Sequence, residues 1–378
     1  MKMTDEKQRV DYWLLLPVLI MMFGSIAVVY SASSTVAAYT FKDPDLFLKQ
    51  HAIRVILGII CIIGFSKINY KVFQKYGKII IWVSIGLLLL IFILGVTKIK
   101  GASRWINLGI FSFQPSDIAK FALIIYLSAL LVKKKDYVHW LYKGYLPLYF
   151  YIILVTGLIL LQPNLSTAVI IFTTSMILLL MSNVKFKHVI FSVLALTPLI
   201  IIFILSKNYI IGRLTSHAEY SSGGESNYQL YQAIIGFGNG GLFGIGPGNS
   251  MQREFFLPEA HADFIFSVIG EEYGFIGTMT VIILYSFIAV RGFATSKRIN
   301  DDYGKYVAIG LTTLITLYAI VNMCVATGLI PTTGVPMPFI SYGGTALLIN
   351  SVAVGILLNI SSGRNLKSQN LELNGFQS

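Results

Sequence analysis

Five titratable side chains lie close together in a chain that is otherwise apolar. The stretch FFLPEAHADFIFSVIGEE contains Glu259, His261, Asp263, Glu271 and Glu272, although 55% of the chain is hydrophobic and only 12% is charged. A carboxylate at the start of an apolar helix can be held by the free N–H groups of the first turn. In a partly dry cleft its basicity rises instead, and it can take a proton as a general base. The neighbouring Glu259 and His261 favour this second interpretation for Asp263, whereas Glu271 and Glu272 are predicted to hold the helix together through buried hydrogen bonds.

Candidate cations lie in two other segments. Arg104 and Trp105, in GASRWIN, follow two lysines. A tryptophan there fits the aromatic belt of a membrane, and the planar fork of an arginine fits a phosphate. Asp117 and Lys120 are three residues apart and therefore share one helical face. They form a mutual ion pair or, alternatively, line a cavity in which Lys120 meets a pyrophosphate.

Other functional classes find little support in the sequence. A net charge of +12 suggests an anionic partner, but the Lys and Arg residues lie in short loops between apolar runs, so nucleic-acid binding is not expected. The GFGNGG stretch contains a formal GxGxxG without a preceding strand, and its glycines are expected to allow tight turns or close approach. Cys61 and Cys324 lie in apolar segments and give no support for a disulfide framework or a metal site.

The elements that must position these groups are predicted to be the helices of an all-α, polytopic membrane protein. The mean hydropathy is +0.73, and a bilayer core needs about 20 apolar residues per helix. Backbone at that depth must satisfy its own hydrogen bonds, which favours helices. The first apolar run is too long for a signal peptide and is predicted to remain as a span. About ten spans qualify: residues 12–32, 48–66, 78–97, 114–132, 145–162, 165–183, 188–206, 263–291, 305–327 and 343–361.

Basic residues orient these spans. With the N-terminus inside, the cytoplasmic segments carry 19 Lys and Arg residues against 8 on the opposite side. Both termini, residues 1–11 and 362–378, are therefore predicted to be cytoplasmic, around a single ten-helix domain of residues 12–361. Irregular backbone near a bilayer survives only where protein or a water-filled cavity surrounds it, so the outer connections predict an extracytoplasmic cavity. These connections are residues 98–113, 162–165, 328–342 and a large loop, 207–262, between the seventh and eighth helices.

Four motifs, in order, resemble those of a known family. GASRWINLG with FQPSDIAK, LQPNLSTA, GGLFGIGPGNSMQREFFLPEAHADFIFSVIGEEYG and GVPMPFISYGG are similar to the successive motifs of the shape, elongation, division and sporulation (SEDS) proteins RodA, FtsW and SpoVE. The resemblance extends from about residue 10 to residue 361, nearly the whole chain. The NSMQREFFLPEAH wording and the LLNIS ending resemble the FtsW and SpoVE branch more than RodA.

This resemblance implies a peptidoglycan glycosyltransferase that polymerises lipid II, an undecaprenyl-pyrophosphate-linked disaccharide peptide, on the outer face of the bacterial cytoplasmic membrane. It also implies a class B penicillin-binding protein, a transpeptidase, as partner. Asp263 corresponds to the essential acid of the family and is predicted to be the catalytic base. The predicted substrate-binding residues are Arg104, Trp105, Asp117, Lys120, Gln162, Arg213, Glu259 and His261, and the structural residues of the last motif are Pro338, Ser341, Tyr342, Gly343 and Gly344.

The chain departs from the family pattern in three places. Ala262 replaces a threonine before the aspartate, and Asp117 replaces a glutamate, so the reach of the groups near the predicted site differs. Asn164 and Ser166 replace an aspartate and a glycine, and Asn164 disfavours any mechanism that needs a carboxylate at that position.

The cofactor that this reaction allows is a divalent cation, Mg²⁺ or Mn²⁺, bound with the substrate pyrophosphate. No nucleotide is expected, because lipid II arrives already activated. Two alternatives are open: a flippase or transporter for the same lipid-linked precursor, and a non-catalytic scaffold. Broken helices and charges inside spans also fit transport, but the inner halves of these spans are almost purely apolar and show no polar path through both leaflets.

Overall fold

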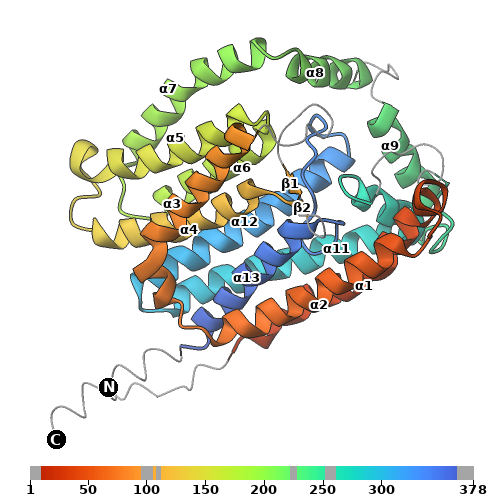
Figure 1. The fold of residues 1–378 in the computed structure, drawn as a ribbon, viewed down its shortest axis with the longest axis horizontal. Helices are drawn as coiled ribbons and strands as arrows, with labels where there is room; N and C mark the ends of the chain where they lie inside the picture. Colours follow the sequence, from red (N-terminus) through yellow and green to blue (C-terminus); the bar gives the residue numbers. More distant parts are fainter. Residues whose placement is uncertain (1–9, 95–104, 108–111, 222–227, 252–260, 364–378) are drawn as a thin grey trace, which may run out of the picture.

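The computed structural model describes residues 10–94, 105–107, 112–221, 228–251 and 261–363, and these form an almost entirely helical bundle (Figure 1). Ten long helices make up most of it: α1 (Tyr12–Phe41), α2 (Leu46–Lys67), α3 (Lys71–Leu94), α4 (Pro115–Lys133), α5 (Leu146–Leu161), α6 (Leu165–Leu180), α7 (Phe186–Leu205), α11 (Ile265–Arg298), α12 (Asp302–Ala326) and α13 (Gly344–Ser361). The smaller elements are α8 (Asn208–Ser221), α9 (Tyr228–Gly240), the π-helical turn η1 (Leu141–Tyr145) before α5, and the hairpin strands β1 (Ile106–Asn107) and β2 (Ser112–Phe113).

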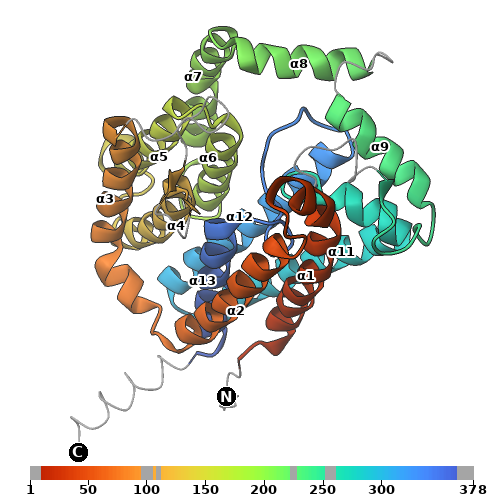
Figure 2. The same cartoon turned by 45° about the vertical axis from the view of Figure 1, so that its right-hand side comes forward.

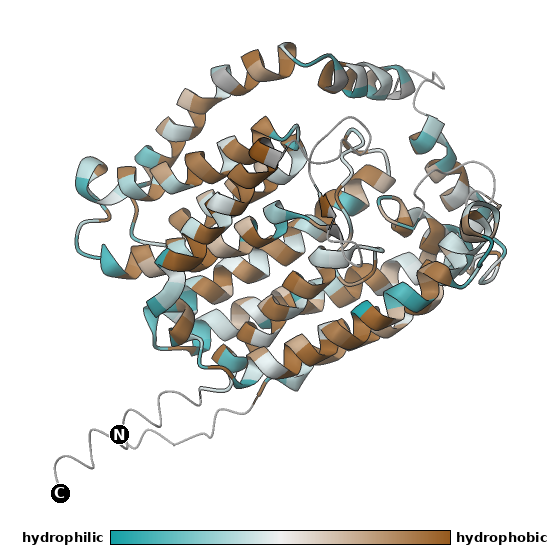
Figure 3. Ribbon diagram, viewed as in Figure 1, coloured by the Kyte–Doolittle hydropathy of each residue, from teal (hydrophilic) through white to brown (hydrophobic). Residues whose placement is uncertain are grey.

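The lengths and composition of the helices confirm the predicted all-α membrane class. Within the described residues, nine helical stretches are long and apolar enough to cross a membrane, and hydrophobic residues cover most of their length (Figure 3). The remaining predicted span, α6, has 16 residues. At 1.5 Å per residue it rises about 24 Å, which is less than the ~30 Å of a typical bilayer core.

Several of the predicted bounds differ from the structure, and the first span and the connection 207–262 differ most. The first span was expected to end at residue 32, but α1 continues to Phe41, because no Gly or Pro stands in residues 33–40 to stop it. The connection 207–262 was expected to be a loop, but α8 and α9 occupy much of it. Helix α9 buries Leu230 and Ala233 on one face, and the glycines of its GFGNGG end concealed this helical spacing.

The core of the bundle is formed by α4, α12 and α13. In the most apolar stretch of α4, 78% of the residues are buried, against 12% in α7. Helix α13 packs along α2, and α12 packs against α4, α6 and α11. Helices α7 and α8 follow the periphery of the molecule (Figures 1 and 2). Exposed side chains of α7 such as Phe191 and Leu194 are apolar, as expected of a helix whose surroundings are hydrocarbon.

Helix α11 is broken at Gly274, and a second segment satisfies the backbone at the break. Gly274 has a φ of +65° and a ψ of −159°, a conformation that glycine alone adopts readily. Backbone groups freed by such a break must find partners, because lipid offers none. Residues 241–246 supply them through four hydrogen bonds of 2.9–3.2 Å, from Ile245 to Glu271, Gly246 to Glu272, Phe275 to Gly241 and Ile276 to Leu242.

The side chains of Glu271 and Glu272 strengthen the same junction. Both residues are 1% exposed. The Glu271 carboxylate accepts a hydrogen bond from the Ser250 hydroxyl. The Glu272 carboxylate accepts from the Gly248 N–H at 3.1 Å and from the hydroxyl of Ser31 in α1. The prediction that these two acids form buried hydrogen bonds is therefore confirmed, although the partners lie in residues 248–250 and in α1 and not in the second half of α11.

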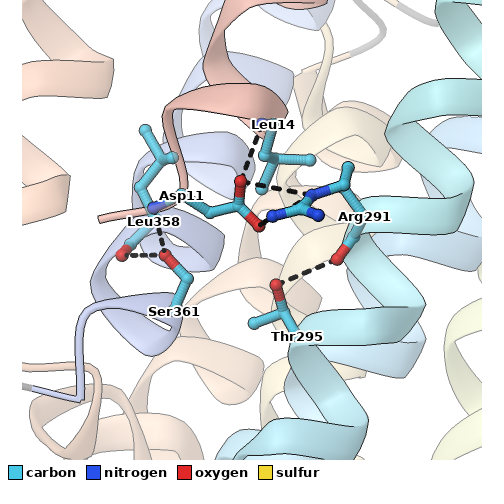
Figure 4. A network of polar contacts seen from close by, with 6 residues as sticks. All are labelled: Asp11, Leu14, Arg291, Thr295, Leu358 and Ser361. Carbon is cyan, nitrogen blue, oxygen red and sulfur yellow. Dashed lines mark hydrogen bonds and ion pairs between the residues drawn. The ribbon is translucent and has the colours of Figure 1, made fainter. Parts of the chain in front are cut away.

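A polar network joins α1, α11 and α13 at the opposite end of α11 (Figure 4). The carboxylate of Asp11 accepts from Arg291 Nε at 3.0 Å and Nη2 at 2.6 Å, and it caps α1 through the N–H of Leu14. The Asp11 N–H donates to the Ser361 hydroxyl at 3.1 Å. The start of α1 and the end of α13 thus lie side by side, at the end of the bundle remote from Asp263.

Candidate functional site

The predicted motifs meet on one segment, residues 331–345, between α12 and α13. Several other parts of the chain bond to it, among them the following five. The donors and acceptors are Ser166 to the Thr333 carbonyl (3.3 Å), Arg213 to the Thr332 carbonyl (3.1 Å), Tyr285 to the Pro338 carbonyl, Tyr342 to the His261 carbonyl (2.9 Å) and Thr345 to the Asp117 carboxylate (2.7 Å). The 331–345 segment is therefore the scaffold that brings the distant motifs together.

The backbone around Asp263 is held at three consecutive carbonyl groups. The three bonds run from the Tyr342 N–H to the His261 carbonyl (2.9 Å), from the Ser341 hydroxyl to the Ala262 carbonyl (2.6 Å) and from the Asn322 side-chain amide to the Asp263 carbonyl (2.9 Å). Residues positioned in this way lose little freedom when a ligand binds, which is a requirement for a catalytic group. Ser341 and Tyr342, two of the predicted structural residues of the last motif, thus supply two of the three bonds.

The carboxylate of Asp263 lies against the backbone of Gly334. Gly334 has a φ of +69°, and a Cβ at this position would stand 3.3 Å from Asp263 Oδ2. The N-cap of α11 is Phe264, so Asp263 lies one residue before the cap. The carboxylate is therefore packed against the 331–345 segment rather than standing at the capping position of α11.

Asp117 and Lys120 form the ion pair that their spacing allows. Lys120 Nζ lies 2.8 Å from Asp117 Oδ1, and the two side chains are 1% and 7% exposed. Lys120 Nζ also lies 4.2 Å from the ring centroid of Tyr318 in α12, and Thr345 bonds the other carboxylate oxygen at 2.7 Å. This geometry favours the mutual ion pair of the two alternatives. A pyrophosphate contact by Lys120 stays a prediction.

Trp105 lies next to the start of α4 through the β1–β2 hairpin. Ile106 pairs with Phe113 and Asn107 with Ser112, and Gln114, directly after β2, is the N-cap of α4. Trp105 is partly buried. The predicted substrate-binding residues Arg104 and Glu259 lie outside the described residues.

Arg213 borders a cavity of about 260 Å³ beside the 331–345 segment. Its walls come from the start of α6, from α8, from Val321 of α12 and from residues 330–333. Most of the lining is apolar, and the polar contributions include Asn164, Ser166 and Arg213. Gly334, which touches the Asp263 carboxylate, directly follows the lining residue Thr333, so the cavity and Asp263 flank the same turn.

Gln162 has a structural contact. It is 3% exposed and caps the end of α5, and its side-chain amide donates to the carbonyl of Leu88 in α3 at 3.0 Å. A substrate contact by Gln162 stays a prediction.

Sequence reasoning overlooked Asn322 and Arg54. Asn322 is 1% exposed and holds the Asp263 carbonyl. Arg54, in α2, places its guanidinium 4.4 Å from the ring centroid of Tyr342. A usable signal existed for both residues, because polar or charged side chains inside predicted spans are uncommon and mark functional positions.

No three His, Cys, Asp or Glu side chains within the described parts of the chain converge in a way that could hold a metal ion. Mg²⁺ commonly takes one or two protein carboxylates and completes its shell with substrate phosphates and water. Asp263 as a single carboxylate fits that mode of binding. A site formed by protein ligands alone does not fit these residues.

These features define a class of protein: a polytopic helical membrane protein with a fixed carboxylate and a neighbouring apolar cavity at one end of the bundle. Residues 11–366 match the family model FTSW_RODA_SPOVE, described as cell cycle protein. The chain belongs to this FtsW/RodA/SpoVE family.

Similar proteins extend along almost the whole chain. It is 38% identical to a probable peptidoglycan glycosyltransferase FtsW of Trichlorobacter lovleyi over 94% of both chains. It is 34% identical to stage V sporulation protein E of Bacillus subtilis over 95% of this chain and 99% of the relative. The predicted likeness to FtsW and SpoVE is confirmed by these matches.

Two solved structures share the fold. A chain from a peptidoglycan synthase complex, studied for its coordination of polymerization and crosslinking, superposes with a TM-score of 0.77 at 24% identity, over 94% of this chain and 98% of that one. The crystal structure of RodA from Thermus thermophilus gives a TM-score of 0.69 at 24% identity, over 94% and 97%. At this identity the likeness establishes the fold.

Proposed function

We propose that this chain is a peptidoglycan glycosyltransferase that polymerises lipid II, with Asp263 as its general base. The observation that carries this proposal is the set of three hydrogen bonds to the carbonyls of residues 261–263, which fix the backbone of Asp263. A cavity with a mostly apolar lining, suited to an apolar ligand, lies on the other side of residues 333–334. Family membership and the similarity to a probable peptidoglycan glycosyltransferase FtsW support the same reaction.

The reaction is glycosyl transfer with inversion. The Asp263 carboxylate takes the proton of the GlcNAc 4-hydroxyl of the acceptor as that oxygen attacks the anomeric carbon of the donor MurNAc. The bond from this carbon to the diphosphate breaks on the opposite face, and undecaprenyl diphosphate leaves with the bonding electrons. Positioned proton transfer of this kind accelerates a reaction by about 10²–10⁴-fold.

The charge that develops on the leaving diphosphate requires cations placed in advance. Arg213 is the best-placed candidate, because it borders the cavity and is held by the Thr332 carbonyl at 3.1 Å. Arg104 is a second candidate. Lys120 is 1% exposed and pairs with Asp117 at 2.8 Å, so it can reach a diphosphate only if the side chains that bury it move aside.

A divalent cation, Mg²⁺ or Mn²⁺, is proposed to bind together with the substrate diphosphate. It would supply positive charge to the phosphate oxygens, with Asp263 as the described carboxylate that could reach it. Proton transfer from the acceptor is proposed for the Asp263 carboxylate, because the Asp117 carboxylate, which also bonds to the 331–345 segment, is already paired with Lys120.

The orientation of the protein in the membrane is proposed from the positions of its termini and of Asp263. The start of α1 and the end of α13 share one end of the bundle, and Asp263 lies at the other end of α11. With the basic connections inside, both termini are proposed to be cytoplasmic and Asp263 to face the outside. A class B penicillin-binding protein is the proposed partner, in keeping with the synthase complex that shares the fold.

The test uses purified full-length protein, alone and with a class B transpeptidase, supplied with fluorescent lipid II. Glycan chains are separated on a gel. We expect the wild type to form chains and Asp263→Asn to form them at least about 100 times more slowly, because the general base is lost. Asp43→Asn is the matched control, since Asp43 is an exposed carboxylate paired with Lys49 in the connection before α2.

Equal chain formation by wild type and Asp263→Asn would remove Asp263 as the base. If wild type forms no chains with any partner but moves fluorescent lipid II across a vesicle membrane, the protein is a flippase instead.

A further inference from the structure

One face of α2 carries polar and aromatic side chains, although the helix is otherwise apolar. These residues recur at i, i+3, i+4 and i+7, which places them on one side of the helix: Phe47, Gln50, His51 and Arg54. On another side of α2, Ile53, Ile56 and Ile60 are each more than half exposed. Helix α2 therefore turns one polar face inward and presents an apolar face to lipid.

The polar face of α2 surrounds Tyr342. The Phe47 ring meets the Tyr342 ring edge-on with centroids 5.1 Å apart and stacks on His261 at the same separation. The Tyr342 hydroxyl donates to Gln50 Oε1, and the Arg54 guanidinium lies 4.4 Å from the Tyr342 ring centroid. Since the Tyr342 N–H holds the His261 carbonyl, only one aromatic residue separates Arg54 from the segment of Asp263.

In the part of the chain that the structure describes, Arg54 has no anionic partner, unlike two other cations of the bundle. Lys120 is paired with Asp117, and Arg291 with Asp11. Within the described residues no carboxylate pairs with Arg54, and its Nη1 atom is buried without a hydrogen-bond acceptor. The ring of Tyr342 offsets part of the cost of this charge, but a ring face accepts none of the guanidinium hydrogen bonds.

We propose that Arg54 binds a phosphate group carried by a lipid, at the edge of the site formed by Tyr342 and Asp263. A guanidinium presents parallel N–H donors that match phosphate oxygens, and a charge inside a span marks a functional position. Arg54 lies eight residues after Leu46, about 12 Å along the helix, and is partly exposed.

Undecaprenyl diphosphate is the phosphate carrier that the proposed function supplies, and this choice of lipid rests on that function. An anionic phospholipid head group carries the same chemistry. The two sources differ in one respect: the first acts as substrate or product, whereas the second is part of the surrounding bilayer.

The experiment measures binding without turnover. Full-length wild type, Arg54→Gln and Arg54→Lys are placed in phosphatidylcholine nanodiscs, with and without phosphatidylglycerol. Undecaprenyl diphosphate is titrated against intrinsic tryptophan fluorescence, and undecaprenol, which lacks phosphate, is the ligand control. Lys49→Gln is the matched protein control, because Lys49 lies on the same helix, is exposed and already pairs with Asp43.

In phosphatidylcholine we expect Arg54→Gln to raise the Kd for undecaprenyl diphosphate about tenfold and Arg54→Lys about threefold, because lysine keeps the charge but not the fork. Undecaprenol binding and Lys49→Gln should not change. The melting temperature of each protein is also compared between nanodiscs with and without phosphatidylglycerol. If Arg54→Gln loses only the stabilisation that phosphatidylglycerol gives the wild type, the phosphate is that of a phospholipid. Unchanged behaviour of Arg54→Gln in both nanodiscs overturns the proposal, and Arg54→Lys decides the matter if Arg54→Gln does not fold.

The test of the Arg54 phosphate site and the test of the proposed glycosyltransferase function can fail independently. Loss of diphosphate affinity in Arg54→Gln, in a wild-type protein that makes no glycan, would retain the phosphate site and reject the polymerase. Glycan synthesis that depends on Asp263, together with an unchanged Kd in Arg54→Gln, would reject the phosphate site alone.

Discussion

The side-chain amide of Asn322 joins Asp263 to the segment that follows α12. Asn322 Nδ2 donates to the Asp263 carbonyl at 2.9 Å and to the Val335 carbonyl at 2.7 Å, and the residue is 1% exposed. One buried amide thus satisfies two backbone acceptors from the two segments that form the site. The position of Asp263 depends on α12, a helix that contributes no predicted catalytic group.

Replacing Asn322 with leucine should lower both stability and turnover. Two carbonyls would lose their donor, and the loss at the buried Val335 carbonyl alone costs about 1–3 kcal/mol of the free energy of unfolding. Glycan formation should slow because the backbone of Asp263 is released. Thermal melting in detergent and the gel assay check the two effects. Thr327→Val is the control, since this hydroxyl bonds only within α12, to the carbonyls of Met323 and Cys324. A fully active Asn322→Leu would show that this bond does not position the base.

Gly334→Ala should impair catalysis more than folding. The new methyl group would stand 3.3 Å from Asp263 Oδ2 and displace it, and the positive φ adds about 1–2 kcal/mol of strain. Gly241→Ala carries comparable strain at a φ of +52° with no heavy atom within 4 Å of the added Cβ. The rate of glycan formation in Gly334→Ala should therefore be well below that of Gly241→Ala at similar melting temperatures. Similar rates in the two variants would contradict the contact with the carboxylate.

Gly244→Ala should prevent residues 241–246 from forming their hydrogen bonds with the backbone of α11 at its break. An added Cβ would lie 2.1 Å from the Glu272 carbonyl oxygen, where neither backbone can move aside. Overpacking of this kind costs about 1–3 kcal/mol or more, so the yield of monodisperse protein in size-exclusion chromatography should fall. In Gly238→Ala, by contrast, the Cβ meets no heavy atom within 4 Å, and the yield should be unchanged. A well-folded Gly244→Ala would show that residues 241–246 are not required to pair with α11.

Separating Asp11 from Arg291 should destabilise the end of the bundle remote from Asp263. The two side chains are 4% and 23% exposed, so removal of one partner should cost more than the ~1 kcal/mol of an exposed pair and less than the ~3–5 kcal/mol of a fully buried one. Asp11→Leu and Arg291→Leu together should cost less than the sum of the single changes, which thermal melts of all four proteins would measure. Additive losses would mean that the pair has no coupling. Lys135→Ala, in an exposed pair with Asp302, should change stability by less than about 1 kcal/mol.

The sequence by itself determined the helices and the identity of the motif residues. Apolar runs of membrane-spanning length leave the backbone no alternative to helix, so each predicted span coincides with a helix of the structure. Residues that usually mark the end of a helix were a less reliable guide to the helix bounds. Helix α1 continued beyond residue 32, and α9 formed in a segment rich in glycine. Propensity is a weak guide where tertiary burial decides whether a marginal helix forms.

Only the tertiary structure decided which of the candidate residues act together. Spacing along α4 allowed Lys120 either to bind a phosphate or to pair with Asp117, and the burial of both side chains between α12 and α13 selected the ion pair. Asp263 and Asn322, which are joined by a hydrogen bond, are 59 positions apart in the sequence. Arg54 and Tyr342, whose guanidinium and ring are in contact, are 288 positions apart. Periodicity describes one helix at a time, whereas these contacts depend on how separate helices pack, and no pattern within a single helix contains that information.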